Sequence, residues 1–427
     1  MEETKASPVN TLPGSDDVTR EVLPNGITVL VRSNFNNPSV VINGYLNTGA
    51  IFDPDDKLGL ADFTAAMLMR GTQKRSFNQI FEVLESSGAS LGFGGNIHTT
   101  SFSGKALIED LPMLLELLYE LLQSPVFPET YVEKMRAQLL TGLAMRVQDT
   151  SEMASLTFDE LIFAGHPYSR PEDGYPETIA RITRDDLAAF HKKHYGPNGM
   201  VLSIVGAVEP RRAIDLVNQW MSSWVNPDQP SQPELPVLAP LAKTLKKKFV
   251  IKGKIQSDIV IGGSAPLRKS DDYMPVSLGN NILGQFGMYG RIGDVVRERS
   301  GLAYYAYTRL NSGTGPGTWE VSAGVNPVNV EKTIALVKKE IKRFITEPVL
   351  EEELKDSQAN YIGRLPLSME SNSGVASALV SLERYQLGLD YYRNYASLVK
   401  AVTPEQILVT VQKYLDPGKL AIAVAGP

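Results

Sequence analysis

The pattern of apolar and polar residues divides the chain into short strands and longer helices. Residues 99–108 alternate with a period of two, as a strand with one buried face does. Asn25-Gly26, between two short apolar runs, is a two-residue hairpin signal. The expected strands are 18–22, 27–31, 39–46, 99–108 and 200–204, then 247–251, 258–263, 303–310 and 318–324. The expected helices include 58–69, 77–86 and 184–194, then 273–283, 292–298, 330–345, 351–364, 374–387, 391–401 and 404–415. Hairpins combined with blocks of helices predict an α+β fold, with helices packed on one face of an antiparallel sheet.

Several of these features recur about 220 residues further along the chain. The break between two helices at Pro125-Val126 has a counterpart at Pro348-Val349. The helix that opens after Thr183 has a counterpart after Thr403. One such match arises easily by chance, but ordered matches at a near-constant spacing do not. The pattern therefore predicts a duplicated domain.

A proline-rich stretch separates the two halves, with prolines at 227, 230, 233, 236 and 240. Each proline fixes φ and removes an N–H donor, so the stretch predicts a semi-rigid linker. The polar residues at the N-terminus predict a disordered lead-in. The predicted organisation is a lead-in at 1–17, a first domain at 18–225, a linker at 226–245 and a second domain at 246–427.

Composition narrows the function classes. The net charge of −6 lacks the basic footprint of a nucleic-acid-binding protein. The chain has no cysteine, which excludes disulfides, thiolate metal ligands and a cysteine nucleophile. No apolar run approaches the ~20 residues of a membrane span, and the lead-in has no signal-peptide core. We therefore expect a soluble protein without nucleic-acid or membrane partners. The cytoplasm is favoured, and a periplasmic or secreted location is left open.

Short motifs spread over both halves together resemble one peptidase family. They include Leu23-Pro24-Asn25-Gly26, Gly59-Leu60-Ala61, His166-Pro167-Tyr168 and the segment from Arg297 to Tyr304. Each motif is weak alone, but their order and spacing make the chain similar to the pitrilysin/insulinase family, the inverzincins. The likeness is strongest to the mitochondrial-processing-peptidase-like branch and covers nearly all of the chain after the lead-in. It implies two homologous domains that form half of a clamshell-shaped peptidase chamber.

The zinc motif of that family is degenerate in this chain. The family holds zinc with His-x-x-Glu-His, because histidines at i and i+4 share one helical face and the glutamate can act as general base. The three positions are occupied by Asp62, Ala65 and Ala66. The distal glutamate ligand of the family falls near Thr141 or Gly142, where no acidic residue occurs. The sequence therefore predicts no metal site and no activity for this chain alone.

A second functional element of the family is retained. Arg297 and Tyr304 match, in type, spacing and context, an Arg/Tyr pair that the resemblance places opposite the zinc. Arg offers a planar set of donors for peptide carbonyls, and a Tyr hydroxyl can donate to an oxyanion. Gly301 is expected as the C-cap of a helix that ends near Arg299, with a strand from Ala303 onward. In that strand, Tyr304 and Ala306 are expected to share one face.

The loss of zinc ligands beside a retained Arg/Tyr pair implies a divided active site. By resemblance, the chain is the non-catalytic subunit of a heterodimeric zinc metallopeptidase. A homologous His-x-x-Glu-His subunit would carry the zinc, and this chain would bind peptide and contribute Arg297 and Tyr304 in trans. The alternatives are a structural scaffold protein of the same fold and a peptide-binding homodimer without chemistry.

Three other features have competing interpretations. His98 lies at the start of a strand that, by resemblance, borders the substrate chamber, so a substrate contact is one interpretation. Gly92-Phe93-Gly94-Gly95 lacks the Gly-Lys-Ser/Thr of a phosphate-binding loop and is interpreted as a flexible loop or irregular edge. The pair His191 and His194 is interpreted as cationic residues at a helix C-terminus rather than as metal ligands.

Overall fold

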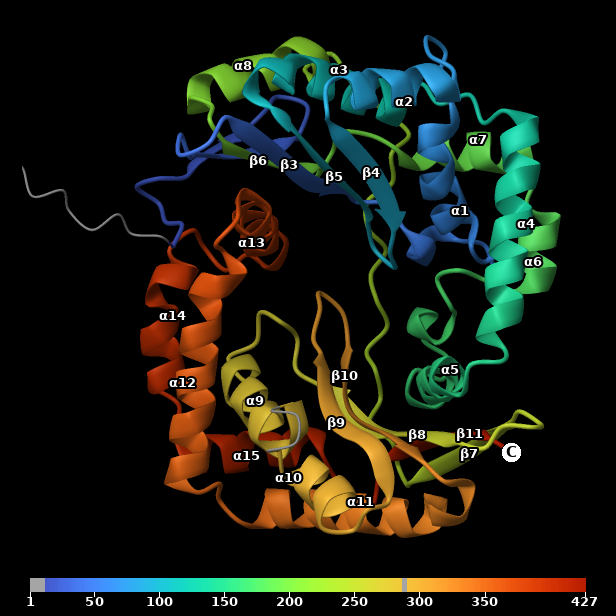
Figure 1. Ribbon diagram of the computed structural model, residues 1–427, viewed down its shortest axis with the longest axis vertical. Coiled ribbons are helices and arrows are strands. Elements are labelled where there is room, and N and C mark those ends of the chain that lie inside the picture. The colour runs from blue at the N-terminus through green and yellow to red at the C-terminus, as the bar shows by residue number, and fades with distance from the viewer. Residues whose placement is uncertain (1–11, 286–289) are drawn as a thin grey trace, which may run out of the picture. The chain divides into compact units, whose positions relative to one another are not determined.

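The computed structural model describes residues 12–285 and 290–427, which fold into two compact units (Figure 1). Unit 1 comprises Met1–Arg136, Arg181–Gln232 and Ile362–Ala396. Unit 2 comprises Ala137–Ala180, Pro233–Tyr361 and Ser397–Pro427. Each unit is built around one sheet. Neither unit is a continuous stretch of sequence, because each contains a segment from the other half of the chain.

The sheet of unit 1 has six strands in the order β1-β2-β6-β3-β5-β4. The strands are β1 (Thr19–Val22), β2 (Thr28–Ser33), β3 (Ser39–Leu46), β4 (Ser90–Gly95), β5 (Thr100–Leu107) and β6 (Val201–Gly206). The pair β2–β6 is parallel, and the other neighbours are antiparallel.

The sheet of unit 2 repeats this arrangement without a counterpart of β1. Its order is β7-β11-β8-β10-β9, and its first pair is again parallel. The strands are β7 (Leu245–Val250), β8 (Ser257–Ala265), β9 (Ala303–Asn311), β10 (Gly317–Val325) and β11 (Ala421–Gly426). The matching strand orders agree with the recurrence of features in the sequence.

The helices surround these two sheets. Unit 1 contains α1 (Leu60–Met67), α2 (Phe77–Ser86), α3 (Leu111–Gln123), α7 (Arg184–His194), α8 (Pro210–Met221) and α13 (Asn372–Tyr385). Unit 2 contains α5 (Thr150–Ile162), α9 (Tyr273–Asn280), α10 (Arg291–Gly293), α11 (Val330–Thr346) and α15 (Pro404–Tyr414). Residues of both units occur in α4 (Glu129–Arg146), α6 (Pro176–Arg181), α12 (Glu351–Ser368) and α14 (Tyr391–Lys400). None of the described helices combines the length and the apolar character needed to cross a membrane.

Each sheet is covered on one face by a helix from the other half of the sequence. In unit 1, α13 packs on β3 and β6, where its apolar side chains meet Val41, Val201 and Val205. Figure 1 shows α3 and α8 on the opposite side of this sheet. In unit 2, α5 packs on β8 and β11 through Phe158 and Ile162. The N-caps of α5 and α13, Asp149 and Ser371, are 222 residues apart, so the exchanged helices are equivalents.

The ends of the two central strands show the repeat at atomic detail. Gly206 ends β6 with φ +149°, and Gly426 ends β11 with φ +156°. A Cβ at Gly206 would lie 2.3 Å from the carbonyl oxygen of Ser39, and one at Gly426 would lie 2.2 Å from Ser257 Oγ. Only glycine therefore fits at either position.

The structure confirms the α+β class with two sheets and most predicted elements. Thr183 and Thr403 both form the N-caps of capping boxes, as their matching sequence context suggests. Three details differ from the sequence prediction. Each sheet has one parallel pair, both faces of each central strand are buried, and β4 is a regular strand rather than a loop. The exchanged helices explain the second difference, because they cover the face that each half leaves open.

Candidate functional site

The helix that would carry a zinc motif is α1, and its N-terminus is held by a buried carboxylate. Asp53 accepts hydrogen bonds from the backbone N–H groups of Gly59 at 2.8 Å and Ala61 at 2.9 Å. These groups belong to the first helical turn, which has no intrahelical acceptors. Asp53 therefore fixes the N-terminus of α1 within unit 1.

The degenerate motif positions lie beside the end of the edge strand β4. The backbone of Gly95 lies so close to α1 that a Cβ at this position would meet Asp62 Oδ1 at 2.7 Å. Ala65 is buried with 1% exposure, and Ala66 is half-buried. The segment thus presents one carboxylate and two methyl groups.

These residues do not fit a zinc ion. A zinc site needs three or four ligands from His, Cys, Asp or Glu, and only Asp62 among the motif positions has such a side chain. On α4, Thr141 donates to the carbonyl of Ala137, and Gly142 has no side chain. Within residues 12–285 and 290–427, no group of three or more such side chains could hold a metal ion.

The four histidines are packed into the fold. His191 Nε2 faces the carbonyl oxygen of Leu122 at 2.8 Å, and burial lowers the pKa of His191 to about 4. His194 stacks on Phe190, and burial lowers its pKa to about 4 as well. The interpretation of both as cationic helix-end residues is therefore wrong, because burial keeps the rings neutral at pH 7. His166 Nδ1 accepts a hydrogen bond from the backbone N–H of Tyr168.

His98 lies in the hairpin between β4 and β5 and contacts the start of the linker. Gln232 donates from Nε2 to the carbonyl of His98 at 2.8 Å and to that of Asn47 at 3.0 Å. The His98 ring lies 3.4 Å from Gln232 Oε1. These contacts give His98 a role in anchoring the linker, and its contact with a substrate stays a prediction.

Arg297 lies in unit 2, in a π-helical turn that spans Asp294–Glu298. The chain leaves this turn through Gly301, whose φ of +58° is left-handed and whose N–H donates to the carbonyl of Arg297. The predicted glycine C-cap is confirmed. The Arg297 side chain is 40% exposed, and its Nε lies 3.5 Å from Glu298 Oε1. Its guanidinium is therefore accessible to a ligand.

Tyr304 is turned into solvent by a β-bulge. In the pairing of β9 with β10, Tyr305 faces Gly324 and Ala303 faces Val325, so Tyr304 is the extra residue on β9. A bulge interrupts the alternation of side chains along a strand. Tyr304 is consequently 84% exposed, whereas Ala306 is buried. The expectation that Tyr304 and Ala306 share one face is therefore wrong.

The residue after the bulge is anchored in the interior of unit 2. The Tyr305 hydroxyl donates to Asp258, which is only 2% exposed. Thr150 Oγ1 and Gln256 Nε2 also donate to this carboxylate. Burial, followed by the hydrogen bond to Asp258, raises the pKa of Tyr305. The sequence analysis missed Asp258, although an Asp at the head of an otherwise apolar strand was a signal for a buried polar partner.

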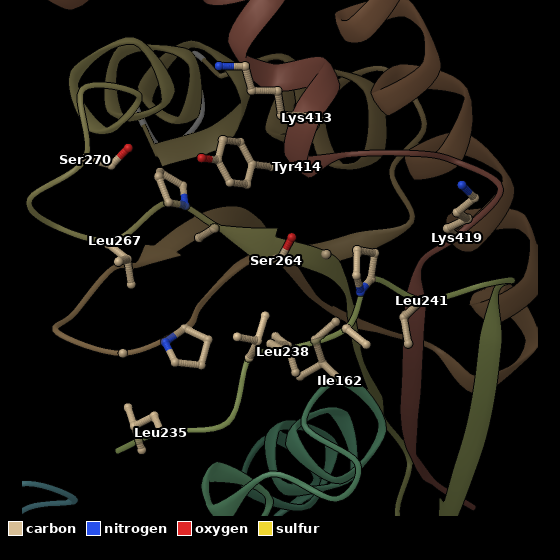
Figure 2. Close-up of a pocket in the computed structure, with 18 of the residues that line it drawn as sticks. Ile162, Leu235, Leu238, Leu241, Ser264, Leu267, Ser270, Lys413, Tyr414 and Lys419 are labelled. Atoms are coloured by element: carbon tan, nitrogen blue, oxygen red, sulfur yellow. The ribbon is translucent and has the colours of Figure 1, made fainter. Parts of the chain in front are cut away.

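A cavity of about 680 Å³ separates the linker from the end of β8 in unit 2 (Figure 2). Its linker wall includes Leu238 and Leu241, which also pack against the core beneath α5. On another wall, the Tyr414 hydroxyl donates to Asp272 at 2.8 Å, and burial raises the pKa of Tyr414 to about 12. The linker is thus docked on unit 2 by its leucines.

Two sequence models of one family match the chain. The model described as "Insulinase (Peptidase family M16)" matches residues 28–171, and the model described as "Peptidase M16 inactive domain" matches residues 181–361. Together they cover well over half of the chain. The chain belongs to peptidase family M16.

This M16 protein is similar to curated relatives along most of their length. An "Uncharacterized zinc protease" of Streptomyces coelicolor is 22% identical over 424 residues, which are 97% of this chain and 90% of the relative. A protein of the same description in Rickettsia bellii is 26% identical over 391 residues, 90% of this chain and 89% of the relative. A "Non-peptidase homolog" of Helicobacter pylori is 23% identical over 401 residues, 93% and 91% of the two chains.

Solved structures agree with the M16 fold. The "peptidase M16 inactive domain" from Pseudomonas fluorescens matches with a TM-score of 0.90 at 25% identity, covering 96% of this chain and 98% of that chain. A "protease from Helicobacter pylori" matches with a TM-score of 0.87 at 18% identity, covering 97% and 100%. Together with the degenerate motif on α1, these findings describe a non-catalytic, zinc-lacking M16 protein.

Proposed function

We propose that this M16 protein is the zinc-lacking subunit of a heterodimeric metallopeptidase. In this role it binds peptide and contributes Arg297 and Tyr304 to the active site of a zinc-bearing partner. One observation carries the proposal. The chain lacks the zinc motif, yet it keeps Arg297 and Tyr304 at the spacing of the family pair, and both side chains are accessible.

The geometry around Tyr304 supports this role. A tyrosine with 84% exposure buries little of its ring, so packing within unit 2 does not explain why an aromatic residue stands there. The bulge and the anchored Tyr305 fix the backbone on which Tyr304 is carried. A fixed backbone limits the entropy that Tyr304 would lose when its hydroxyl donates to an oxyanion.

Arg297 fits the same task by its chemistry. Its guanidinium has several donors in one plane and can hold two peptide carbonyl oxygens at once. The turn that ends at Gly301 sets the spacing between Arg297 and the strand that carries Tyr304. In the proposed reaction, Arg297 binds the peptide backbone and Tyr304 stabilises charge on the attacked carbonyl.

The proposed partner is a homologous chain with an intact His-x-x-Glu-His motif. The partner would supply the zinc, because the residues of this chain that the structure describes contain no ligand set for it. The peptide would bind in extended form along a sheet edge, by addition of a strand. β4 ends the sheet of unit 1, so one side of its backbone has no strand partner among the described residues.

Reconstitution tests the proposal. Each chain is purified separately and mixed with a fluorogenic unfolded peptide as substrate. We expect negligible turnover by this chain alone, turnover by the mixture, and a heterodimer with one zinc ion in native mass spectrometry. A zinc-bearing chain that is fully active alone and forms no complex would contradict the proposal.

A scaffold or peptide-binding protein without a peptidase role is the second candidate. The relative named a non-peptidase homolog favours it. This candidate requires the fold and an interface, but not the chemistry of Arg297 and Tyr304. A native complex of two copies of this chain, with no zinc-bearing chain bound, would support it.

A further inference from the structure

A shallow groove lies on the sheet of unit 1, on the face covered in part by α13. It has a volume of about 730 Å³. Its floor is formed by alternate residues of two neighbouring strands, which pair across the sheet as Ser90–Lys105, Gly92–Ser103 and Gly94–Ser101. On the far side, Asn43 donates to Ser377 Oγ at 2.8 Å, which fixes the wall that α13 provides.

The groove exists because β4 has glycines on this face. A Cβ at Gly92 would meet no atom within 4 Å, and one at Gly94 would meet only Ser101 Oγ at 3.4 Å. Larger side chains would therefore fit at both positions and fill the groove. Close packing within the chain therefore does not require glycine at either position. The space beside these glycines is open to a ligand.

The groove borders the free edge of the sheet. An extended peptide that adds to β4 would point every second side chain to the face on which Gly92 and Gly94 lie. The row of β5 residues is two strand spacings, about 10 Å, from such a peptide. A long side chain of the peptide can cross the glycine positions and approach this row, which ends at Lys105, the residue paired with Ser90.

The charge of the groove selects the kind of side chain. Among the described residues that line the groove, Lys105 has the charged side chain. Within the part of the chain that the structure describes, no carboxylate pairs with it. Its ammonium is exposed. Ser90, which pairs with Lys105 across the strands, and Ser103 also line the groove, and their hydroxyls can donate to an anionic oxygen. The groove therefore complements a carboxylate better than an ammonium or an apolar group.

We infer that this groove is a side-chain subsite that selects an acidic residue in an extended peptide paired with β4. The inference rests on the proposed function, because it takes a peptide as the ligand. It adds the class of peptide that would bind. The backbone of this peptide pairs with the edge strand β4, and its acidic side chain approaches Lys105 from two strand spacings away.

Peptide binding to the purified full-length chain tests this subsite. The probes are fluorescein-labelled peptides of alternating threonine and alanine with a central Glu, Gln or Lys, measured by fluorescence anisotropy. We expect the Glu peptide to bind about three- to fivefold more tightly than the Gln peptide at low ionic strength, with a smaller ratio at high salt. The Lys peptide should bind most weakly.

Variants at two positions, Lys105 and Gly92, assign the effect to the groove. Lys105→Gln should abolish the preference for Glu over Gln, and Lys105→Glu should favour the Lys peptide. Gly92→Val should remove the discrimination by filling the groove, and its fold is preserved because the added atoms have space. Lys74→Gln, at an exposed lysine outside the groove, should leave the preference unchanged and serves as the matched control.

The outcomes separate this inference from the proposed function. Equal binding of the Glu and Gln peptides, or a preference that survives Lys105→Gln, overturns the acidic subsite alone. In that case peptide binding and the role of Arg297 and Tyr304 still stand. Absence of binding for every peptide overturns both the subsite and the peptide-binding part of the proposed function.

Discussion

The hydroxyl of Tyr305 donates to the buried carboxylate of Asp258, and this bond fixes the strand directly after the bulge that exposes Tyr304. The exposed residue and the anchored residue are neighbours in sequence but point to different environments. Asp258 therefore connects the interior of unit 2 to the backbone that presents Tyr304.

Replacing Asp258 with asparagine should destabilise unit 2. An asparagine amide offers one acceptor where the carboxylate accepts from Tyr305, Thr150 and Gln256, so at least one buried donor loses its partner. We expect a loss of about 1–3 kcal/mol in the free energy of unfolding, measured by urea denaturation. Asp271→Asn, at an exposed position, is the control and should stay within about 0.5 kcal/mol. A stable Asp258→Asn protein would show that this carboxylate does not hold the strand.

The variants Arg297→Ala and Tyr304→Phe should lower turnover without lowering the stability of the fold. Both side chains are substantially exposed, so each variant should keep its stability within about 0.5 kcal/mol. In the reconstituted heterodimer, loss of the Tyr304 hydroxyl should lower kcat about 100-fold, as loss of an oxyanion donor does. Arg297→Ala should lower kcat/KM by a similar factor.

Matched controls for these variants lie on the same segment. Arg299 pairs with Asp294 and is 75% exposed, and Tyr307 follows on β9. Arg299→Ala and Tyr307→Phe should leave turnover unchanged. Unchanged turnover in all four variants would refute a catalytic contribution and favour the scaffold function.

The raised pKa of Asp159 predicts that the free energy of unfolding decreases as the pH rises. Burial, followed by the nearby Glu320 and Glu172, raises the pKa of Asp159 to about 8. Because the folded pKa exceeds the unfolded value of about 3.8, the folded protein holds a proton that the unfolded chain has released, and stability declines between about pH 4 and pH 8. Asp159→Asn, which is neutral throughout, should lessen the decline by about 4 kcal/mol in urea melts at pH 5 and pH 9. Asp228→Asn, on the exposed linker, should show the wild-type slope.

Zinc removal should leave this chain unaffected. Since the described residues contain no ligand set, incubation with a chelator should not change its Tm, and elemental analysis should find less than one zinc per chain. The same treatment of the reconstituted heterodimer should abolish turnover. A stoichiometric zinc in the isolated chain would contradict the interpretation of Asp62, Ala65 and Ala66.

The exchanged helix makes unit 1 depend on the C-terminal half of the chain. Leu379 of α13 is fully buried against the sheet, so Leu379→Ala should cost about 2–5 kcal/mol. An excised fragment 18–225 should expose Val41, Val201 and Val205, and it should bind the dye ANS strongly. A fragment that is monomeric, cooperatively folded and free of ANS binding would disprove this dependence.

The sequence predicted those elements whose signals are local. The N-caps Thr183 and Thr403 and the left-handed Gly301 could be recognised in the sequence. Each residue type begins or ends a helix through its own side chain or backbone conformation, within a few residues. The loss of zinc ligands at Asp62, Ala65 and Ala66 was equally readable, since metal binding requires particular side chains.

Features that depend on distant segments were not predictable in this way. The composition of β4 favours a loop, because glycine weakens a strand, and pairing with β5 overrides that tendency. The exposure of Tyr304 depends on the register between β9 and β10, which a strict alternation misses. The partners of Asp258 lie on three separate segments, so its role appears only when the chain is folded.

The exchange of α5 and α13 also constrains the order of events during synthesis on the ribosome. The strands of unit 1 are complete once β6 has emerged, at Gly206, but the helix that covers one face of their sheet ends at Tyr385. An apolar surface of unit 1 therefore waits, uncovered, while most of the second half is translated. Because transiently exposed apolar surface promotes association between chains, the nascent protein is most prone to aggregation during that interval.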